Sequence, residues 1–267
     1  MVSAVPFQYE NHMLAVPVVV GDVETTFIFD TGIGVNLISP DLAAKVSCVS
    51  LGETYAGRRM SGQPVTVPMS TLSSLKLGDY ASENVAIGVF DLAGIAGLVS
   101  LTSFRTTPVT IDYQAGAIVI EDERSLADRL ARGTSVPINV HEDGPYSTDV
   151  YIDLTLPGGR SVKVEVDTGS DNLILNEPFA AQSAIDLEAE STRRVRGQDE
   201  TGHEYARYFT TLPGDISLTA APAFRQHDPQ VMFQKIIYDG LLGDSFLRNF
   251  VTTYDLANSR MIFASGG

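Results

Sequence analysis

The stretch FIFDTGIGVNLIS, residues 27–39, decides the fold together with its counterpart VEVDTGSDNLIL, residues 164–175. Each contains an Asp-Thr-Gly triplet after an apolar run rich in Phe, Ile and Val, which is typical of a buried strand. Asp30 and Asp167 are 137 positions apart, about half of the 267 residues. Self-similarity at half the chain length indicates two copies of one folding unit.

The similarity continues on both sides of the triplets. Downstream, IAGLVSLTSF from Ile95 aligns with YDGLLGDSFL from Tyr238, and TIDYQAGAIVI from Thr110 aligns with TYDLANSRMIF from Thr253. Upstream, each triplet follows a predicted strand pair that turns at Gly-containing dipeptides. The strand pairs are residues 14–20 with 25–29 and residues 150–156 with 162–166. We therefore expect an N-terminal lobe over residues 1–124, a charged linker over 125–134, and a C-terminal lobe over 135–267.

Composition restricts the classes of function. The net charge of −15 disfavours nucleic acid as a partner, because phosphate binding needs clustered Lys and Arg. Cys48 is the single cysteine, so neither an intrachain disulfide nor a cysteine-based zinc site can form. The four histidines are scattered, and we expect no metal and no cofactor.

The sequence shows no targeting or membrane segment. No apolar run approaches the roughly 18 residues of a membrane span. The first residues, MVSAVPFQYENH, lack the basic and apolar regions of a signal peptide. We expect a soluble protein and leave its compartment open, with a periplasmic or secreted location as an option if a signal peptide has been removed.

Two carboxyl groups in contact can perform chemistry that one cannot. Like charges about 3 Å apart do not both ionise readily, so the pair shares one proton. One member then acts as a base toward water while the other donates a proton to a carbonyl oxygen. We expect Asp30 and Asp167 to form such a pair, supported by Thr31, Gly32, Thr168, Gly169 and Ser170.

The paired Asp-Thr-Gly motifs, the LIS and LIL runs that follow them, and Leu241-Leu242-Gly243 resemble the pepsin and retropepsin superfamily of aspartic peptidases. The resemblance spans nearly the whole chain. It implies an all-β, bilobal fold with two β-barrel-like lobes around a pseudo-twofold axis, and an endopeptidase that binds an extended peptide between them. The short lobes and the lack of disulfides are most like a bacterial single-chain, duplicated retropepsin-like protease, which we expect to be a monomer.

The family also implies a β-hairpin flap over the cleft. Two segments are candidates, residues 53–67 and residues 194–210. Tyr55 in the first and Tyr205 in the second are the candidate aromatic side chains that cover the substrate.

Two residues of the first half depart from the family pattern. Ile33 stands where a small or hydroxylated residue such as Ser170 is usual, and Ser100 stands where the apolar-apolar-Gly element has Gly. Ser100 puts close backbone packing behind the first loop in doubt. The alternative is therefore a catalytically silent peptide-binding relative. A carboxylate-pair glycosidase is remote, because its carboxyls stand about 5 to 9 Å apart and sugar clefts usually display tryptophan, which this chain lacks.

Overall fold

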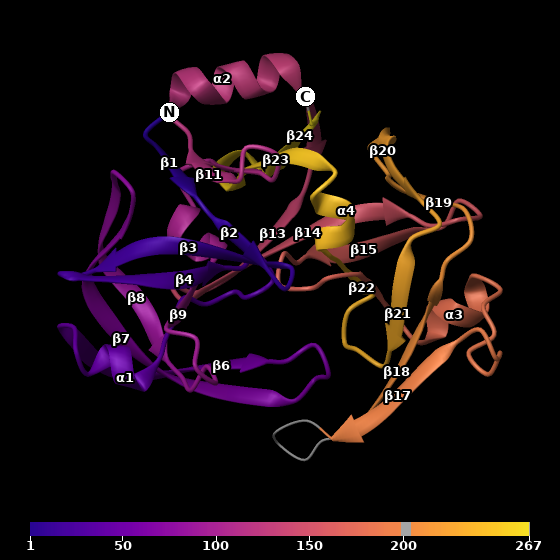
Figure 1. Cartoon of the computed structure of the whole chain (residues 1–267), viewed down its shortest axis with the longest axis horizontal. Helices are drawn as coiled ribbons and strands as arrows, with labels where there is room; N and C mark the ends of the chain where they lie inside the picture. Colours follow the sequence, from indigo (N-terminus) through magenta and orange to yellow (C-terminus); the bar gives the residue numbers. More distant parts are fainter. Residues whose placement is uncertain (199–203, 267) are drawn as a thin grey trace.

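The computed structural model describes residues 1–198 and 204–266. They form two β-rich lobes side by side with a third sheet across one end (Figure 1). The predicted all-β, bilobal architecture is confirmed. None of the helices in these ranges is long and apolar enough to cross a membrane.

The first lobe is built on an eight-stranded sheet. Its core forms because side chains alternate between the two faces of a strand, so that Leu14, Val16 and Val18 all point inward and are buried. Gly21, with a φ of +59°, makes the turn into the strand that carries the triplet. In spatial order the strands are β2 (Gln8–Glu10), β3 (Met13–Val20), β4 (Val23–Phe29), β9 (Gly97–Val99), β5 (Leu37–Ile38), β8 (Tyr80–Val89), β7 (Pro64–Leu77) and β6 (Cys48–Arg58).

The second lobe repeats this topology in a ten-stranded sheet. In spatial order its strands are β17 (Arg193–Gln198), β18 (Glu204–Thr211), β21 (Gln230–Gln234), β16 (Leu173–Asn176), β22 (Gly240–Leu242), β15 (Ser161–Val166), β14 (Ser147–Thr155), β19 (Asp215–Leu218) and β20 (Ala221–His227), with β13 (Asn139–Asp143) paired to β14. The path β3-β4-β9-β5-β8-β7-β6 matches β14-β15-β22-β16-β21-β18-β17, and the parallel and antiparallel pairings agree. The sequence repeat is thus a structural repeat.

A six-stranded sheet joins the two halves. Its strands, in order, are β1 (Ser3–Pro6), β11 (Ala117–Ile120), β10 (Val109–Asp112), β23 (Phe250–Asp255), β24 (Arg260–Ser265) and β12 (Thr134–Pro137). Thr110 and Thr253, which are equivalent in the repeat, lie opposite each other at the centre, and their hydroxyl oxygens are 2.7 Å apart. The pseudo-twofold axis therefore passes between them.

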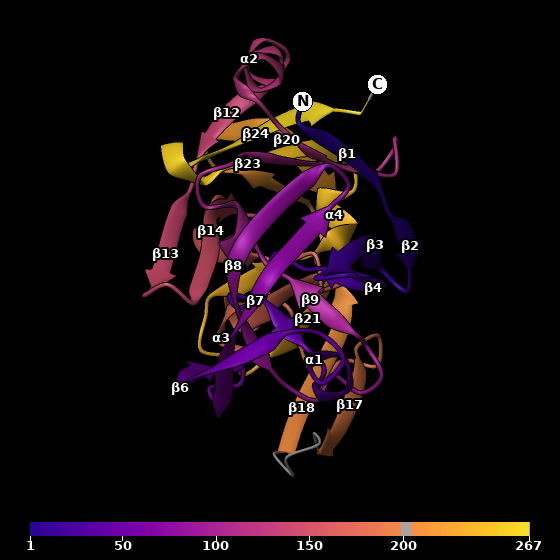
Figure 2. The same cartoon turned by 90° about the vertical axis from the view of Figure 1, so that its left-hand side faces the viewer.

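Helices are short and lie outside the sheets. The charged segment expected to link the lobes forms the longest one, α2, which begins at a capping box of Asp122 and Ser125 and lies over the six-stranded sheet at one end of the molecule (Figures 1 and 2). The helices are α1 (Pro40–Ala43), α2 (Glu123–Arg132), α3 (Pro178–Gln182) and α4 (Asp244–Leu247), with 3-10 turns at η1 (Leu101–Phe104) and η2 (Leu256–Asn258).

Candidate active site

The two Asp-Thr-Gly loops lie at equivalent ends of equivalent strands. Asp30 directly follows β4, and its amide donates to the Val99 carbonyl at 3.0 Å. Asp167 directly follows β15, and its amide donates to the Leu242 carbonyl, also at 3.0 Å. Because these contacts match, each aspartate is fixed in the same way relative to its own lobe.

Thr31 and Thr168 hold the two loops together. The Thr31 amide donates to Thr168 Oγ1 at 3.0 Å, and the Thr168 amide donates to Thr31 Oγ1 at 3.0 Å. Each hydroxyl also donates into the other lobe, Thr31 to the Val166 carbonyl at 2.8 Å and Thr168 to the Phe29 carbonyl at 3.4 Å. Both threonines are buried, so these bonds are shielded from water and fix the separation of the loops.

The triplet glycines permit the close approach of the two carboxyl groups. The Gly32 amide donates to Asp30 Oδ1 and the Gly169 amide to Asp167 Oδ1, each at 2.9 Å. A Cβ at Gly32 would lie 2.2 Å from Asp167 Oδ1, and one at Gly169 would lie 2.6 Å from Asp30 Oδ2. Any side chain at either position would therefore displace the carboxyl group of the opposite lobe.

The two carboxyl groups hydrogen-bond each other and hold a proton tightly. Burial, partly offset by amide donors, raises the pKa of Asp30. Burial, followed by the charge of Asp30, raises the pKa of Asp167 to about 8. The pair titrates as a unit and retains one shared proton up to neutral pH. This arrangement can activate a water molecule as a base and donate a proton as an acid.

Ser100 does not loosen the packing behind the first loop, contrary to the doubt raised by the sequence. It is completely buried, its amide donates to Asn36 Oδ1 at 2.9 Å, and its hydroxyl lies 3.3 Å from the Gly34 carbonyl. Asn36 Oδ1 also accepts from the Ser103 hydroxyl at 3.1 Å. A buried polar cluster thus supports the first loop. At the equivalent position of the second lobe, Gly243 allows direct backbone contact instead.

Ile33 and Ser170 occupy equivalent positions with different contacts. Ile33 packs into an apolar cluster around Val35, Leu37 and Val67 on the first-lobe side. The Ser170 hydroxyl donates to the Asn172 carbonyl at 3.2 Å. The two loops therefore differ at this position, since Ile33 packs against apolar side chains whereas Ser170 forms a hydrogen bond within its own loop.

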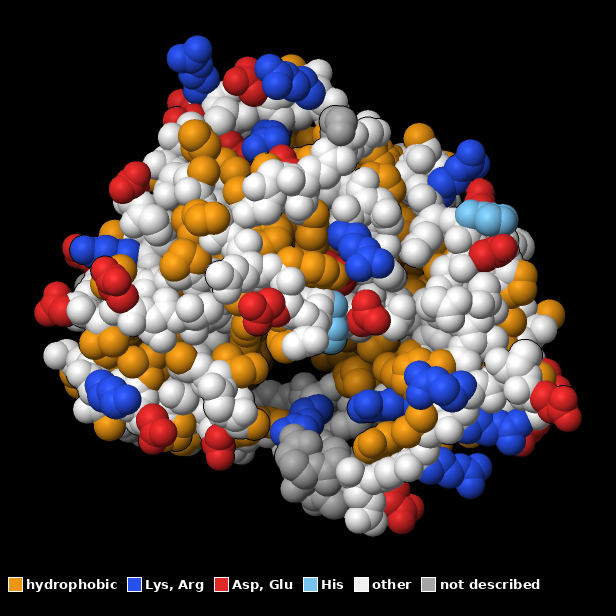
Figure 3. Space-filling view, in the orientation of Figure 1, with side chains coloured by type: hydrophobic (Ala, Val, Ile, Leu, Met, Phe, Trp, Pro, Cys, Tyr) orange, Lys and Arg blue, Asp and Glu red, His pale blue; other side chains and the backbone are white. Residues whose placement is uncertain are grey.

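A hollow of about 720 Å³ lies between the lobes and contains both aspartates. It is lined by the Asp-Thr-Gly loops, the β6–β7 hairpin, the start of β14 and the loop before β22. Figure 3 shows the surface hollowed between the lobes. The tip of the hairpin reaches the second lobe, where the Ile237 amide donates to the Met60 carbonyl at 2.9 Å. Tyr55 lines the hollow from this hairpin.

Comparison with known proteins agrees with this geometry. Residues 16–103, which contain the first triplet and Ser100, match the family described as aspartyl protease. The whole structure resembles the crystal structure of an aspartic proteinase from Irpex lacteus, with a TM-score of 0.61 and 13% identity, over 98% of this chain and 97% of that chain. A comparison with curated proteins gives no match. Residues 16–103 are thus similar to the aspartyl protease family, and the chain as a whole has the fold of that aspartic proteinase.

Only one of the two candidate tyrosines faces the hollow between the lobes. Tyr205 lies on β18, with the Arg207 guanidinium 4.2 Å from its ring centre, and does not line the hollow. The β17–β18 hairpin is the topological equivalent of the β6–β7 hairpin, so both candidate segments are hairpins of the same kind. Residues 199–203 of the second candidate lie outside the described residues.

Sequence reasoning missed two residues beside Asp30 and Asp167. Glu165 lines the hollow two positions before Asp167, with 4% of its surface exposed. Because alternate residues of a strand share a face, its spacing from Asp167 was a usable signal. His12, in the turn between β2 and β3, has Nε2 3.1 Å from the Gly169 carbonyl, and only the folded structure brings it there.

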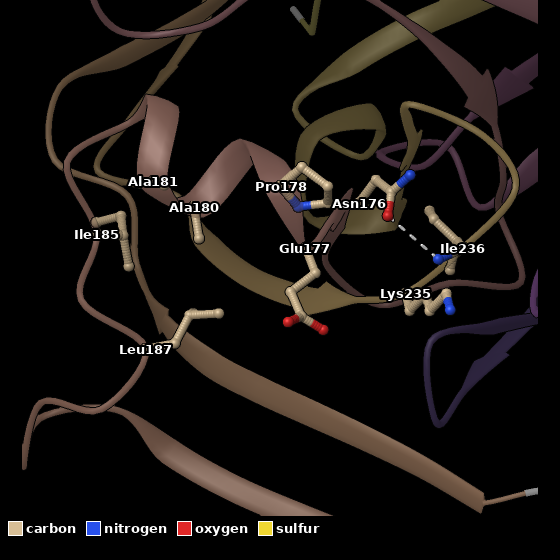
Figure 4. Close-up of a pocket in the computed structure, with 9 residues that line it drawn as sticks. All are labelled: Asn176, Glu177, Pro178, Ala180, Ala181, Ile185, Leu187, Lys235 and Ile236. Carbon is tan, nitrogen blue, oxygen red and sulfur yellow. Dashed lines mark hydrogen bonds between the residues drawn. The ribbon is translucent and has the colours of Figure 1, made fainter.

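A second hollow of about 540 Å³ lies beside α3 (Figure 4). Of the residues that the structure describes, none lines both this hollow and the cleft, and Glu177 is the single carboxyl group in this one. Its lining residues are Asn176, Glu177, Pro178, Ala180, Ala181, Ile185, Leu187, Lys235 and Ile236. Among the described residues that line this second hollow, no two carboxyl groups face each other as Asp30 and Asp167 do.

Proposed function

We propose that the protein is an aspartic endopeptidase in which Asp30 and Asp167 activate the water that hydrolyses a peptide bond. The observation that carries the proposal is the pair of half-buried carboxyl groups that meet in the inter-lobe hollow. Their raised pKa supplies the singly protonated state that the chemistry needs at acidic to neutral pH.

The reaction needs no covalent intermediate. The ionised carboxyl of the pair takes a proton from water as the water oxygen bonds to the scissile carbonyl carbon, and the protonated carboxyl gives its proton to the carbonyl oxygen. The resulting diol collapses as a proton passes to the amide nitrogen and the C–N bond breaks. The products are a carboxylic acid and an amine, and the pair again holds one proton. Because the pair shares that proton, neither residue has a fixed role.

The substrate would bind as an extended peptide under the β6–β7 hairpin, hereafter the flap. Tyr55 lines the hollow from the flap, which supports it over Tyr205 as the covering aromatic residue. Backbone pairing of a peptide with strand-like edges fits such a cleft.

We further propose that the lobes span residues 1–124 and 135–267 and that they arose from a duplicated retropepsin-like unit of bacterial type. We also propose that the protein is a monomer, since both aspartates belong to one chain.

The test is cleavage of denatured casein from pH 3 to 7.5, with and without pepstatin. Asp30→Asn and Asp167→Asn should each abolish cleavage, and circular dichroism should show both variants folded. Asp153→Asn, an exposed carboxyl on β14 outside the hollow, is the matched control and should cleave like the wild type. Retained cleavage in either Asn variant would contradict the mechanism, and a folded wild type without cleavage would favour a silent peptide-binding protein.

A further inference from the structure

The second-lobe wall of the hollow carries more carboxyl groups than the hydrolysis uses. On β15, Val162, Val164 and Val166 point into the lobe core and are buried. Glu165 alternates with these valines and therefore points to the opposite face of the strand. Asp167, two positions later, follows on that same face. Glu165 pairs across the sheet with Tyr151 of β14, and Asp149 lies two positions before Tyr151 on the same face. The strand pattern thus gathers Asp149, Tyr151 and Glu165 on one wall of the hollow.

Glu165 has no partner on this wall. Although 96% of its surface is covered, its side chain makes no hydrogen bond or ion pair with any residue in the described ranges. Ionising a largely covered carboxyl group of this kind is unfavourable, because few of its water contacts remain and no protein donor replaces them. A protein retains such a group readily where a ligand completes it.

Asp149 adds a second acidic group to the same wall. Gly34 lets it approach the first Asp-Thr-Gly loop, because a Cβ there would lie 2.5 Å from Asp149 Oδ1. The contacts near Asp149 are the Ser147 hydroxyl at 3.5 Å and the charge of His141. Burial is the main cause that raises the pKa of both carboxyls, to about 9 for Glu165. A cationic group bound between them would reverse that shift by stabilising their ionised forms.

Two tyrosines complete the wall. Tyr151 and Tyr238 both line the hollow, and their ring centres are 5.9 Å apart. Aromatic faces suit the aliphatic stem of a lysine or the plane of an arginine guanidinium, whose charge then reaches the carboxyls. The repeat equivalent of Glu165 in the first lobe is Ile28, so the acidic wall has no counterpart there.

We propose that Asp149, Tyr151, Glu165 and Tyr238 form a subsite that binds a lysine or arginine side chain of the substrate next to the scissile bond. The subsite rests on the proposed peptidase function and specifies its substrate class. Arg58 and Arg59 line the flap side of the same hollow. They are the groups of the protein itself that compete with a substrate side chain as a source of positive charge for Asp149 and Glu165. Arg58 Nη1 donates to the Gly62 carbonyl at 3.0 Å within the flap itself.

The test is a cleavage profile of denatured casein at pH 6, with the new chain ends read by mass spectrometry. Lys and Arg should be enriched at one position within two residues of the cleaved bond. In matched peptides, replacement of that Lys by norleucine should lower kcat/KM at least about tenfold, as expected when a charged site loses its partner. Glu165→Gln and Asp149→Asn should each bring the ratio of kcat/KM for the Lys peptide to kcat/KM for the norleucine peptide close to one, and Asp153→Asn should leave that ratio at its wild-type value.

Each outcome separates the subsite from the peptidase function. Casein cleavage without enrichment of Lys or Arg, or a preference unchanged in Glu165→Gln, overturns the subsite and leaves the peptidase function standing. If no substrate is cleaved, the peptidase function fails, and fluorescence anisotropy of the Lys and norleucine peptides on the wild type decides the subsite. Tighter binding of the Lys peptide that is lost in Glu165→Gln supports it, and equal binding overturns it.

Discussion

Thr31 and Thr168 exchange two hydrogen bonds of equal length, each amide donating to the other hydroxyl at 3.0 Å. The exchange lies on the same pseudo-twofold axis that passes between Thr110 and Thr253. The two halves are therefore joined by equivalent residues at both places. Because the carboxyl groups directly precede these threonines, the exchange sets how closely Asp30 and Asp167 approach.

Removing either hydroxyl should damage both stability and activity. Thr31→Val keeps the shape of the side chain but leaves the Thr168 amide buried without an acceptor, at a cost of about 2 kcal/mol of unfolding free energy. A displacement of one carboxyl should lower kcat about tenfold or more, since the pair depends on contact. Urea unfolding and peptide hydrolysis measure the two effects. Thr31→Ser keeps the hydroxyl and should restore most of both, so a Ser variant as impaired as the Val variant would contradict this role.

Tyr55 should matter for substrate binding in a way that Tyr205 does not. Tyr55→Ala removes an aromatic side chain that lines the hollow from the flap, so kcat/KM for a peptide should fall about tenfold or more. Tyr205→Ala is the matched control on the equivalent hairpin and should stay within about twofold. Steady-state hydrolysis of one fluorogenic peptide compares them. Equal losses in the two variants would assign the covering role to neither hairpin.

Activity should persist to neutral pH and fall above it. The pair must hold one proton to act, and burial with the charge of Asp30 raises the pKa of Asp167 to about 8. As the pH rises through that value the shared proton is lost and the acid function disappears, so kcat/KM should fall on the alkaline side near pH 8. Hydrolysis rates from pH 4 to 9.5 give the profile. An alkaline decline complete by pH 5 would show that the pair does not hold its proton in this way.

The repeat in the sequence was sufficient to predict the two lobes, the strand pairs before each triplet and the meeting of Asp30 with Asp167. These features follow from local strand patterns and from the symmetry of a duplicated unit. The covering hairpin could not be chosen, because the hairpins of Tyr55 and Tyr205 have the same topology and differ only in what they face. The support of Ser100 by Asn36 was also hidden, since 64 positions separate them.

The free energy of unfolding should fall as the pH rises, because the folded protein keeps Glu165 protonated at pH values where the unfolded chain has released that proton. Burial is the main cause that raises its pKa from 4.5 to about 9, so the folded state holds a proton that the unfolded state releases above pH 4.5. The stabilisation by this proton is complete below pH 4.5 and is lost as the pH rises from there through about 9. Glu165→Gln carries no titrating proton, so it should match the wild type at pH 4 and exceed it by at least about 1 kcal/mol at pH 8. Urea unfolding at both pH values measures the difference, and parallel pH dependences in the two proteins would contradict it.

Ser100 and Gly243 should not be interchangeable, although they are equivalent in the repeat. A Cβ at Gly243 would lie 2.3 Å from the Asn172 carbonyl oxygen and 2.7 Å from that of Ser170, both in the loop that carries Asp167. Backbone atoms cannot move aside as a flexible side chain can, so Gly243→Ser should cost about 2 to 3 kcal/mol and lower kcat through Asp167.

The reverse change removes contacts without creating a clash. Ser100→Gly loses the hydroxyl contacts with Asn36 Oδ1, the Gly34 carbonyl and the Thr102 amide, at 3.2, 3.3 and 3.3 Å, but keeps the amide bond to Asn36. Its cost should be about 1 kcal/mol, with kcat within about threefold of the wild type. Urea unfolding and peptide hydrolysis of both variants compare the two positions. A larger loss of stability and kcat in Gly243→Ser is expected, because the second loop depends on backbone contact and the first on the buried Asn36 cluster. Equal losses in the two variants would mean that the two loops have the same support.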